Sequence, residues 1–495
     1  MSTKGTARRA PRGWRLLVTL ATTALICGLL GAPATQAAPS TTTAPQARQG
    51  TAAAAAPSAV SVVEEAAARP VPRPSRRTVV SLSFDDGIDD QQVGADILDA
   101  AGIAGTFYVT TAWIDKPGFL TRAQLDSMAD SGHEIGGHTV SHRDLAQIPR
   151  SEVKRQVCNG RKALQDWGFS PTSLAYPFAS STAVAEEVAL ECGYDTARGL
   201  GDLRGPASCV GCPWAETLPP GDAAYLAAPE QVNSSWTLSQ LKRQVTQARK
   251  SGGGWVILTF HNVCSDPGSA GCPASQSVTP QTLTAFATWL RSYTANRTNQ
   301  TTTAPVGDTY EASLGVRYPG YQDAVAEPAP PPAPVGQNAL SNASLEQLEG
   351  QVPDCFERAG YGDNTASWSL VPGRTGQVAQ QLTVTGYQSG DAKLMPEMDL
   401  GTCSPSVVPG RTYDLSTWYT STGITQYALY YRTSTDEWRY WTSSPWFATA
   451  TDWTEATWTT PPVPQDATAV SFGLALIADG TLVTDDYGMT DPGGE

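Results

Sequence analysis

Three of the four histidines in this chain of 495 residues fall within one short stretch, Gly132 to His142. Two of them, His138 and His142, are four residues apart, so both imidazoles can face a single ion if the segment coils. A third ligand is then required, and the segment Ser83 to Gly87, which contains two adjacent aspartates, is its obvious source. One carboxylate and two imidazoles predict a metal centre with coordination positions left open for water and a substrate oxygen.

The candidate ligands follow apolar runs that are typical of buried strands. The aspartate pair follows the run from Thr78 to Phe84, and the fourth histidine, His261, follows Trp255 to Phe260. Such runs alternate with capped amphipathic segments as far as about Gly315, which predicts parallel strands covered by helices, in a barrel or a doubly wound sheet. Active sites in these folds lie at the carboxyl ends of the strands. The expected helices cover residues 90–101, 121–131, 151–167, 182–192 and 237–250, and a last one begins near Pro280.

Three motifs in this region resemble those of the polysaccharide deacetylase, or NodB-like, family of carbohydrate esterases. They are Ser83 to Gly87, His138 to His142 and Leu258 to His261, in the family's order. The resemblance covers residues 76–315. It implies a deformed (β/α) barrel and metal-dependent removal of acetyl groups from a polysaccharide, with zinc or cobalt as the expected ion.

The resemblance also assigns roles to single residues. Asp86, His138 and His142 are the expected metal ligands. Asp85 would be the general base that takes a proton from water, and His261 would protonate the departing amine.

The oxyanion of the reaction would be held by the backbone N–H of Phe178, which follows Pro177. The chain departs from the family's pattern two residues before this proline, where an arginine often orients the catalytic aspartate and this sequence has Ala175. Arg198, at the end of the next strand-like run, is the candidate replacement. The remaining histidine, His133, lies within a predicted strand and is expected to be a hydrogen-bonded core residue rather than a ligand.

A second domain is expected beyond a proline-rich linker at residues 316–337. Residues 338–495 contain short aromatic or β-branched runs separated by turn residues, which predicts a separate all-β sandwich. The domain resembles a carbohydrate-binding module of the jelly-roll type in the segments 342–346, 408–413 and 484–487. In similar modules two carboxylates, here Glu346 and Asp486, share a structural calcium ion; surface carboxylates are the alternative.

Aromatic residues are concentrated in the second domain between Tyr427 and Trp441. Trp438, Tyr440 and Trp441 could present flat rings to a sugar, or all of them could belong to the core. The sequence leaves both interpretations open.

The first 37 residues predict a secretory signal peptide, with five basic residues before an apolar run from Leu16 to Ala32. A membrane anchor is the weaker alternative because the run is short. Residues 38–75 predict a disordered spacer. Loss of the five basic residues moves the formal charge from −14 to −14 − 5 = −19, which argues against nucleic acid or a membrane as a partner. We therefore expect a secreted monomer that acts on a polysaccharide.

Eight cysteines remain after the expected cleavage, an even number that suggests disulfides in an exported chain. The predicted pairs are Cys355–Cys403, Cys264–Cys272, Cys158–Cys192 and Cys209–Cys212, although sequence alone does not fix the connectivity. Half of a zinc site is the alternative for Cys209 and Cys212.

Three classes of function remain open. The leading one is deacetylation of an extracellular glycan, with a chitin-like N-acetylglucosamine polymer ahead of acetylxylan and peptidoglycan. The second is a polysaccharide-binding protein whose hydrolase domain is inactive. The third is hydrolysis of a small cyclic amide, for which an appended sugar-binding domain has no purpose.

Overall fold

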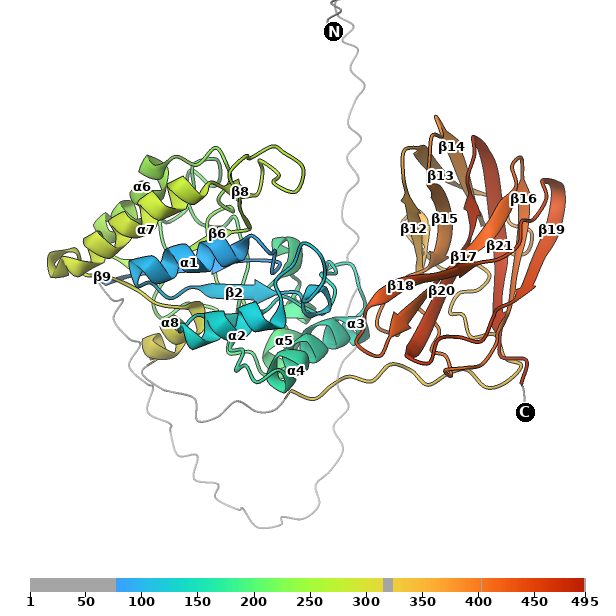
Figure 1. Ribbon diagram of the computed structural model, residues 1–495, viewed down its shortest axis with the longest axis horizontal. Coiled ribbons are helices and arrows are strands. Elements are labelled where there is room, and N and C mark those ends of the chain that lie inside the picture. Colours follow the sequence, from blue (N-terminus) through green and yellow to red (C-terminus); the bar gives the residue numbers. More distant parts are fainter. Residues whose placement is uncertain (1–76, 315–323, 402, 494–495) are drawn as a thin grey trace, which may run out of the picture. The chain divides into compact units, whose positions relative to one another are not determined.

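The computed structural model describes residues 77–314, 324–401 and 403–493. The expected signal peptide, the spacer and part of the linker lie outside these residues. An α/β domain and an all-β domain follow one another along the chain (Figure 1).

The α/β domain is built on seven parallel strands. Six of them lie in the order β5-β4-β3-β2-β1-β6, and β9 pairs with β1. This curled half-barrel fits the (β/α) barrel that the sequence predicts. The strands are β1 (Thr78–Phe84), β2 (Thr106–Val109), β3 (Glu134–Gly137), β4 (Ser173–Ala175), β5 (Thr196–Arg198), β6 (Gly254–Phe260) and β9 (Thr301–Thr303).

Helices cover the strands, and α1 and α2 run alongside them in Figure 1. The amphipathic pattern explains this packing: the buried residues of α1 include Gln91, Ala95 and Leu98, which recur on one helical face. Thr121 and Thr237 form capping boxes where α2 and α6 begin. The helices are α1 (Gln91–Ala101), α2 (Arg122–Asp130), α3 (Arg150–Lys154), α4 (Gly160–Asp166), α5 (Ala183–Glu191), α6 (Leu238–Lys250), α7 (Pro280–Ala295) and α8 (Val306–Leu314).

Two differences from the predicted elements stand out. The helix expected at 151–167 contains a π-helical turn, Arg155–Asn159, between α3 and α4. The helix that begins at Pro280 is not the last one, because β9 and α8 follow it. The strand β9 is three threonines long and carries no apolar alternation, so the sequence pattern does not reveal it.

The second domain consists mainly of two five-stranded antiparallel sheets, with an apolar core that includes Tyr427, Phe472 and Tyr487. This confirms the all-β prediction, whereas the jelly-roll type remains a prediction. One sheet has the order β12 (Phe356–Tyr361), β15 (Asp391–Pro396), β20 (Ala467–Leu476), β17 (Thr425–Thr433) and β18 (Trp438–Ser443). The other has the order β13 (Thr365–Val371), β14 (Ala379–Thr385), β21 (Gly480–Thr490), β16 (Asp414–Ser421) and β19 (Ala450–Thr459).

Two small two-stranded sheets are also present. They are β7 (Asn262–Val263) with β8 (Ser277–Val278), and β10 (Leu348–Glu349) with β11 (Val352–Pro353).

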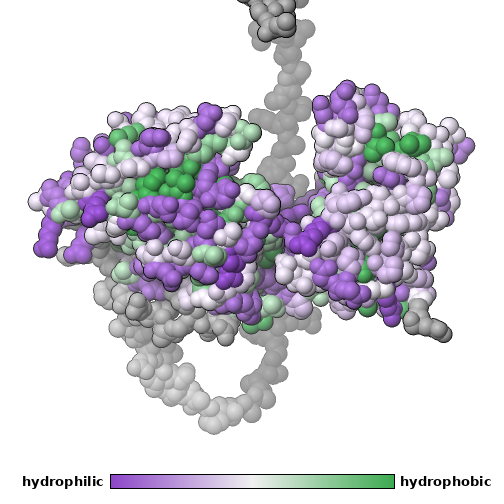
Figure 2. Space-filling model, in the orientation of Figure 1, coloured by the Kyte–Doolittle hydropathy of each residue, from purple (hydrophilic) through white to green (hydrophobic). Residues whose placement is uncertain are grey.

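Hydrophilic side chains dominate the face of the α/β domain that Figure 2 shows.

All four predicted disulfides are present: Cys158–Cys192, Cys209–Cys212, Cys264–Cys272 and Cys355–Cys403. None of them joins the two domains. The half zinc site considered for Cys209 and Cys212 is therefore wrong in this structure. Within the described residues no helix is both long and apolar enough to cross a membrane.

Candidate active site

The carboxyl ends of the parallel strands meet around a cavity of about 280 Å³. Asp85 and Asp86 follow β1, His138 and His142 follow β3, and His261 follows β6. These five residues all line the cavity, as the sequence predicts from their places after apolar runs. The other residues that line it are Tyr176, Phe178, Ala179, Leu200, Gln231 and Gln276.

Asp86, His138 and His142 form the group that could hold a metal ion. One ligand atom from each lies within 4.8 Å of the others, and no other such group exists among the described residues. The Oδ1 atom of Asp86 is 3.2 Å from Nε2 of His138 and 3.3 Å from Nε2 of His142. A carboxylate with two imidazoles is a donor set that zinc and similar divalent ions accept, so these residues fit the expected ion.

The two histidines do not converge through a helical turn, which corrects the helical geometry considered from their spacing. The segment is a loop in which Thr139 and His142 adopt left-handed backbone angles, with φ of 68° and 58°. The Thr139 hydroxyl accepts a hydrogen bond from the backbone N–H of His142 at 3.0 Å and so stabilises this loop. Asp86 is also left-handed, at φ 83°. Such angles are uncommon for residues with a side chain, and functional sites are where they concentrate.

Hydrogen bonding fixes the tautomer of His138. Its Nδ1 lies 2.8 Å from the carbonyl oxygen of Ala175, and because a carbonyl only accepts, Nδ1 carries the hydrogen. In the neutral ring Nε2 then keeps its lone pair for a metal. Burial raises the pKa of Asp86, but the adjacent His138 and His142 outweigh this effect and hold the pKa well below its usual range. The Asp86 carboxylate is therefore an ionised ligand at neutral pH.

Asp85 is paired with Arg198. The carboxylate is 3% exposed and the arginine 0% exposed. The Nη2 atom of Arg198 donates to Oδ1 at 2.6 Å and to Oδ2 at 2.5 Å. Arg198 on β5 is the register partner of Ala175 on β4, so its guanidinium approaches from the strand beside the one where the family often places an arginine.

His261 is buried at the end of β6 beside the two aspartates. Burial lowers its pKa, although the charges of Asp85 and Asp86 act in the opposite direction. Its Nδ1 atom is buried and has no hydrogen-bond partner among the described residues.

An exposed aromatic ring stands at the cavity wall. Phe178 is 68% exposed and has a φ of 57° within the short turn Pro177–Ala179. Its ring meets the His142 imidazole edge-on with centroids 4.6 Å apart, and Trp113 stacks on the same imidazole at 5.2 Å. The two aromatic rings thus hold His142 in place.

His133 is a core residue, as predicted. Its Nδ1 accepts a hydrogen bond from the backbone N–H of Gly105 at 2.9 Å, and its Nε2 is 3.2 Å from Asp99. It precedes β3, whereas His138 and His142 follow that strand, so the structure does not bring it to the cavity.

The two carboxylates expected to share calcium both contact the loop at 374–378. Glu346 accepts from the backbone N–H groups of Gln377 and Val378. Asp486 accepts from the Arg374 guanidinium at 2.7 Å and the Thr375 hydroxyl at 2.6 Å. Because an arginine already balances Asp486, the structure adds no support for calcium, which remains a prediction.

Several residues of the site carry no sequence signal. Leu200, Gln231 and Gln276 come from connecting segments without periodicity. Gln91 is a further case, because its Nε2 donates to the backbone oxygens of Asp85 and of His261, the latter at 3.1 Å. The sequence places Gln91 on the buried face of α1, but it does not indicate that the side chain bonds to Asp85 and His261.

Comparison with known proteins identifies the α/β region. Residues 73–197 match the polysaccharide deacetylase family. The peptidoglycan-N-acetylglucosamine deacetylase PgdA of Listeria monocytogenes is 31% identical over 140 residues, which are 27% of this chain and 28% of that protein. The chitooligosaccharide deacetylase of Sinorhizobium fredii is 34% identical over 90 residues, 17% of this chain and 39% of that protein.

Similarity to solved structures is weaker. A family 4 carbohydrate esterase from Streptomyces lividans, solved in complex with acetate, has a TM-score of 0.29 and 14% identity, and the match covers 46% of this chain and 92% of that one. The sequence relatives are matched over less than half of their own lengths. These comparisons show that residues 73–197 are similar to polysaccharide deacetylases.

Proposed function

We propose that the protein is a secreted, metal-dependent deacetylase that hydrolyses N- or O-acetyl groups of an extracellular glycan containing N-acetylglucosamine. The observation that carries the proposal is one cavity that holds a three-residue metal-ligand group together with a buried aspartate and a buried histidine. The four disulfides support an oxidising, extracellular location.

The residues divide the work of amide or ester hydrolysis. A divalent ion held by Asp86, His138 and His142 would polarise the acetyl carbonyl and acidify water. Asp85 takes a proton from the attacking water, and His261 delivers a proton to the departing amine or alcohol.

Two further groups support this chemistry. Arg198 keeps Asp85 in one orientation through its contacts with both carboxylate oxygens. The backbone N–H of Phe178 is the proposed donor to the oxyanion, and the turn that carries it forms part of the cavity wall.

The test is acetate release from chitin oligomers, acetylxylan and peptidoglycan, with and without a chelator. We expect chelation to abolish release and zinc or cobalt to restore it. Asp85→Asn should keep the metal and lower turnover by about 10²–10⁴-fold. Full activity of metal-free protein would refute the metal's role, and near-normal turnover of metal-loaded Asp85→Asn would refute the base.

We also propose that the β domain binds glycan through the sheet that contains β12 and β18. The ammonium of Lys393 lies 5.9 Å from the ring of Tyr361 and 5.4 Å from that of Tyr430. Tyr430 in turn contacts Tyr440, with centroids 5.8 Å apart. Tyr361 and Tyr440 are 67% and 59% exposed, so they offer rings to a sugar beside a buried cation.

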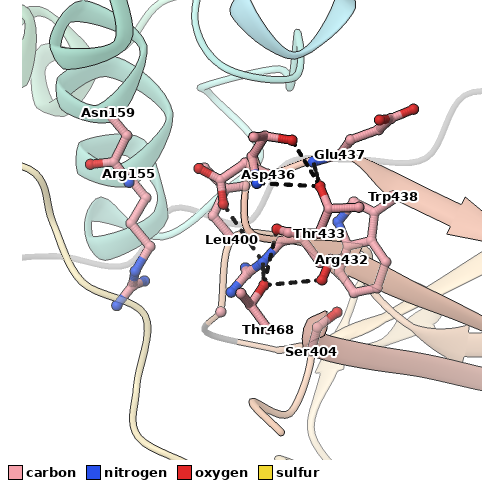
Figure 3. A network of polar contacts seen from close by, with 12 residues as sticks. Arg155, Asn159, Leu400, Ser404, Arg432, Thr433, Asp436, Glu437, Trp438 and Thr468 are labelled. Carbon is pink, nitrogen blue, oxygen red and sulfur yellow. Dashed lines mark hydrogen bonds and ion pairs between the residues drawn. The ribbon is translucent and has the colours of Figure 1, made fainter. Parts of the chain in front are cut away.

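The predicted aromatic residues do not all belong to this surface. Trp441 packs against the sandwich core, so its predicted stacking role finds no support. The indole N–H of Trp438 donates to the backbone oxygen of Asp399. Figure 3 shows the buried Arg432 next to it, hydrogen-bonded to Thr468 at 3.0 Å. This network stabilises the turn between β17 and β18 and thereby the position of Tyr440.

A polysaccharide-binding protein without catalytic activity is the competing function. The intact set of Asp85, the three ligands and His261 favours an enzyme. The same acetate-release assay separates the two functions, because an inactive protein would bind the polymer and release nothing.

A further inference from the structure

A second hollow in the α/β domain has no part in the reaction proposed above. It has a volume of about 240 Å³ and is lined by residues that include Arg204, Trp214, Gln240, Arg243 and Gln244. Gln240, Arg243 and Gln244 lie in the first half of α6, and Arg204 and Trp214 lie in the long connection between β5 and α6.

Two arginines in this hollow lie near the same aromatic ring. The guanidinium carbon of Arg204 is 5.1 Å from the centroid of Trp214, and that of Arg243 is 5.4 Å from it. Neither arginine forms an ion pair with any residue in the described part of the chain. The Nε–H of Arg204 is buried and finds no hydrogen-bond acceptor there.

The hollow and the reaction cavity are lined by different residues, but two segments of the chain connect them. Leu200 lines the cavity, and Arg204 follows it by four residues, so their Cα atoms are at most about 14 Å apart. The loop after Arg204 is fixed to Glu230, whose carboxylate accepts from Ala207 N at 2.8 Å and from the Ser208 hydroxyl. Glu230 immediately precedes Gln231, which lines the reaction cavity. The chain from Leu200 to Arg204 and the hydrogen bonds of Glu230 therefore link the lining of the hollow to the lining of the reaction cavity.

We propose that Arg204 and Arg243 bind an anionic group, a carboxylate or a phosphate, on a glycan chain whose acetylated residue lies in the reaction cavity. A guanidinium presents paired N–H donors that match a carboxylate or phosphate, and stacking on Trp214 holds both planes in place. The inference rests on the proposed function and narrows its substrate to an acidic glycan, in place of the neutral chitin-like polymer that the sequence ranks first.

The experiment compares soluble oligosaccharides that differ in charge. Acetate release by the metal-loaded full-length protein is measured on neutral chitooligosaccharides, on N-acetylglucosamine oligomers that carry a muramic acid carboxylate, and on oligomers that carry a phosphate. Arg243→Gln and Arg204→Gln should raise KM for an anionic substrate about 10-fold or more, leave kcat unchanged, and leave both constants for the neutral substrate unchanged. The two anionic arms show whether the preferred group is a carboxylate or a phosphate.

The matched control is Lys242→Gln, which removes one positive charge from the same helix. Lys242 contacts Trp289 at 5.5 Å rather than the hollow, so this variant should behave as the parent protein does. The advantage of the anionic substrate should also shrink as the salt concentration rises.

Three outcomes would overturn the inference. One is an equal KM for neutral and anionic substrates in the parent protein. The second is an equal effect of Lys242→Gln and Arg243→Gln. The third is a loss of thermal stability in the arginine variants with all substrates affected alike, which would mean that the Arg–Trp–Arg contact is purely structural. If no substrate releases acetate, the proposed function fails. The anion site is then tested by calorimetric titration of the parent protein and of Arg243→Gln with the same oligosaccharides. Equal affinities of the two proteins for the anionic oligosaccharides would exclude the site.

Discussion

Asp85 and Arg198 form an ion pair beside the reaction cavity. Both groups are buried, and one arginine nitrogen donates to both carboxylate oxygens. Ala175 and Arg198 are register partners on adjacent parallel strands, so a guanidinium on either strand starts from the same level of the sheet. We therefore propose that Arg198 on β5 takes the place of the arginine that the resemblance leads us to expect at position 175 on β4.

The register of Ala175 and Arg198 predicts that an arginine at position 175 can restore activity that is lost when Arg198 is removed. Arg198→Ala should lower turnover at least 10-fold and destabilise the fold by about 3–5 kcal/mol, because it leaves a buried carboxylate without its cation. The double variant Ala175→Arg with Arg198→Ala should recover part of the turnover, since the new side chain can enter the vacated space. The measurements are kcat and the free energy of unfolding for both variants. Recovery of stability without any recovery of kcat would contradict an orienting role for the arginine.

Asp195, just before β5, allows a prediction about pH. Burial raises its pKa to about 6, with the charge of Glu311 acting in the same direction, and its Oδ2 atom has no hydrogen-bond partner among the described residues. Since an unfolded aspartate has a pKa of about 3.9, the folded state holds a proton that the unfolded chain has lost between about pH 4 and 6. Stability therefore falls as pH rises through this window.

Asp195→Asn should remove this loss. We expect its melting temperature to exceed that of the parent by roughly 2 °C at pH 7.5 and to equal it near pH 4. Asp130→Asn, which changes an exposed carboxylate on α2, is the control and should show no such dependence. A constant difference across the pH range would mean that ionisation of Asp195 does not affect stability.

Residues of the site differ in how far they could be predicted. Asp85, Asp86, His138, His142 and His261 lie in contiguous motifs after strands, so type and spacing were sufficient. Arg198 could be proposed only as a candidate, from its position at the end of a predicted strand. Its contact with Asp85 depends on the register of the sheet, which the sequence does not show. Gln231 and Gln276 reach the cavity from irregular segments, and no local pattern specifies where such segments fold.

At the scale of elements, the first turn of α1 joins the two strands that carry the proposed base and acid. Gln91 donates to the backbone oxygens of Asp85 and His261. The carboxylate of the preceding Asp90 accepts from Val263 N at 3.0 Å and from Asn262. The Oε1 atom of Gln91 has no partner among the described residues, which costs stability. The two hydrogen bonds that this amide donates hold the ends of the two strands at a fixed spacing.

Gln91→Met keeps the volume and removes both donated hydrogen bonds. We expect kcat to fall about 10- to 100-fold, since small displacements of reacting groups are costly, with KM and bound metal unchanged. Gln92→Met is the matched control, because the neighbouring glutamine bonds only to Asp96 on the helix surface. Equal kcat values for the two variants would show that Gln91 does not position the catalytic pair.

Element prediction succeeded where patterns were long and failed where they were short. Capping boxes and amphipathic faces gave α2 and α6 nearly to the residue. The three-residue strand β9 and the helix α8 after it were not predicted. The position of β9 depends on its pairing with β1. The position of α8 depends on Val306 and Tyr310, which belong to a buried apolar cluster.

At the scale of the whole molecule, each domain has its own core. The clusters that contain Phe84, Leu174 and Trp255 belong to the α/β domain, and the cluster with Phe472 belongs to the β domain. Every residue with a proposed catalytic role lies before the linker. The β domain should therefore change which substrates the enzyme reaches rather than how it reacts.

The double variant Tyr361→Ala with Tyr440→Ala tests this division in the full-length protein. Each ring contributes about 0.5–1.5 kcal/mol of contact beyond its buried area, so binding to an insoluble acetylated polymer should weaken about 10-fold, and acetate release from that polymer should fall with it. Activity on soluble oligomers should stay at the parent level, because tethering raises only the local concentration of the catalytic domain at a surface. Equal activity on the polymer would exclude these tyrosines from binding. A loss on soluble oligomers would mean instead that the β domain contributes to the active site itself.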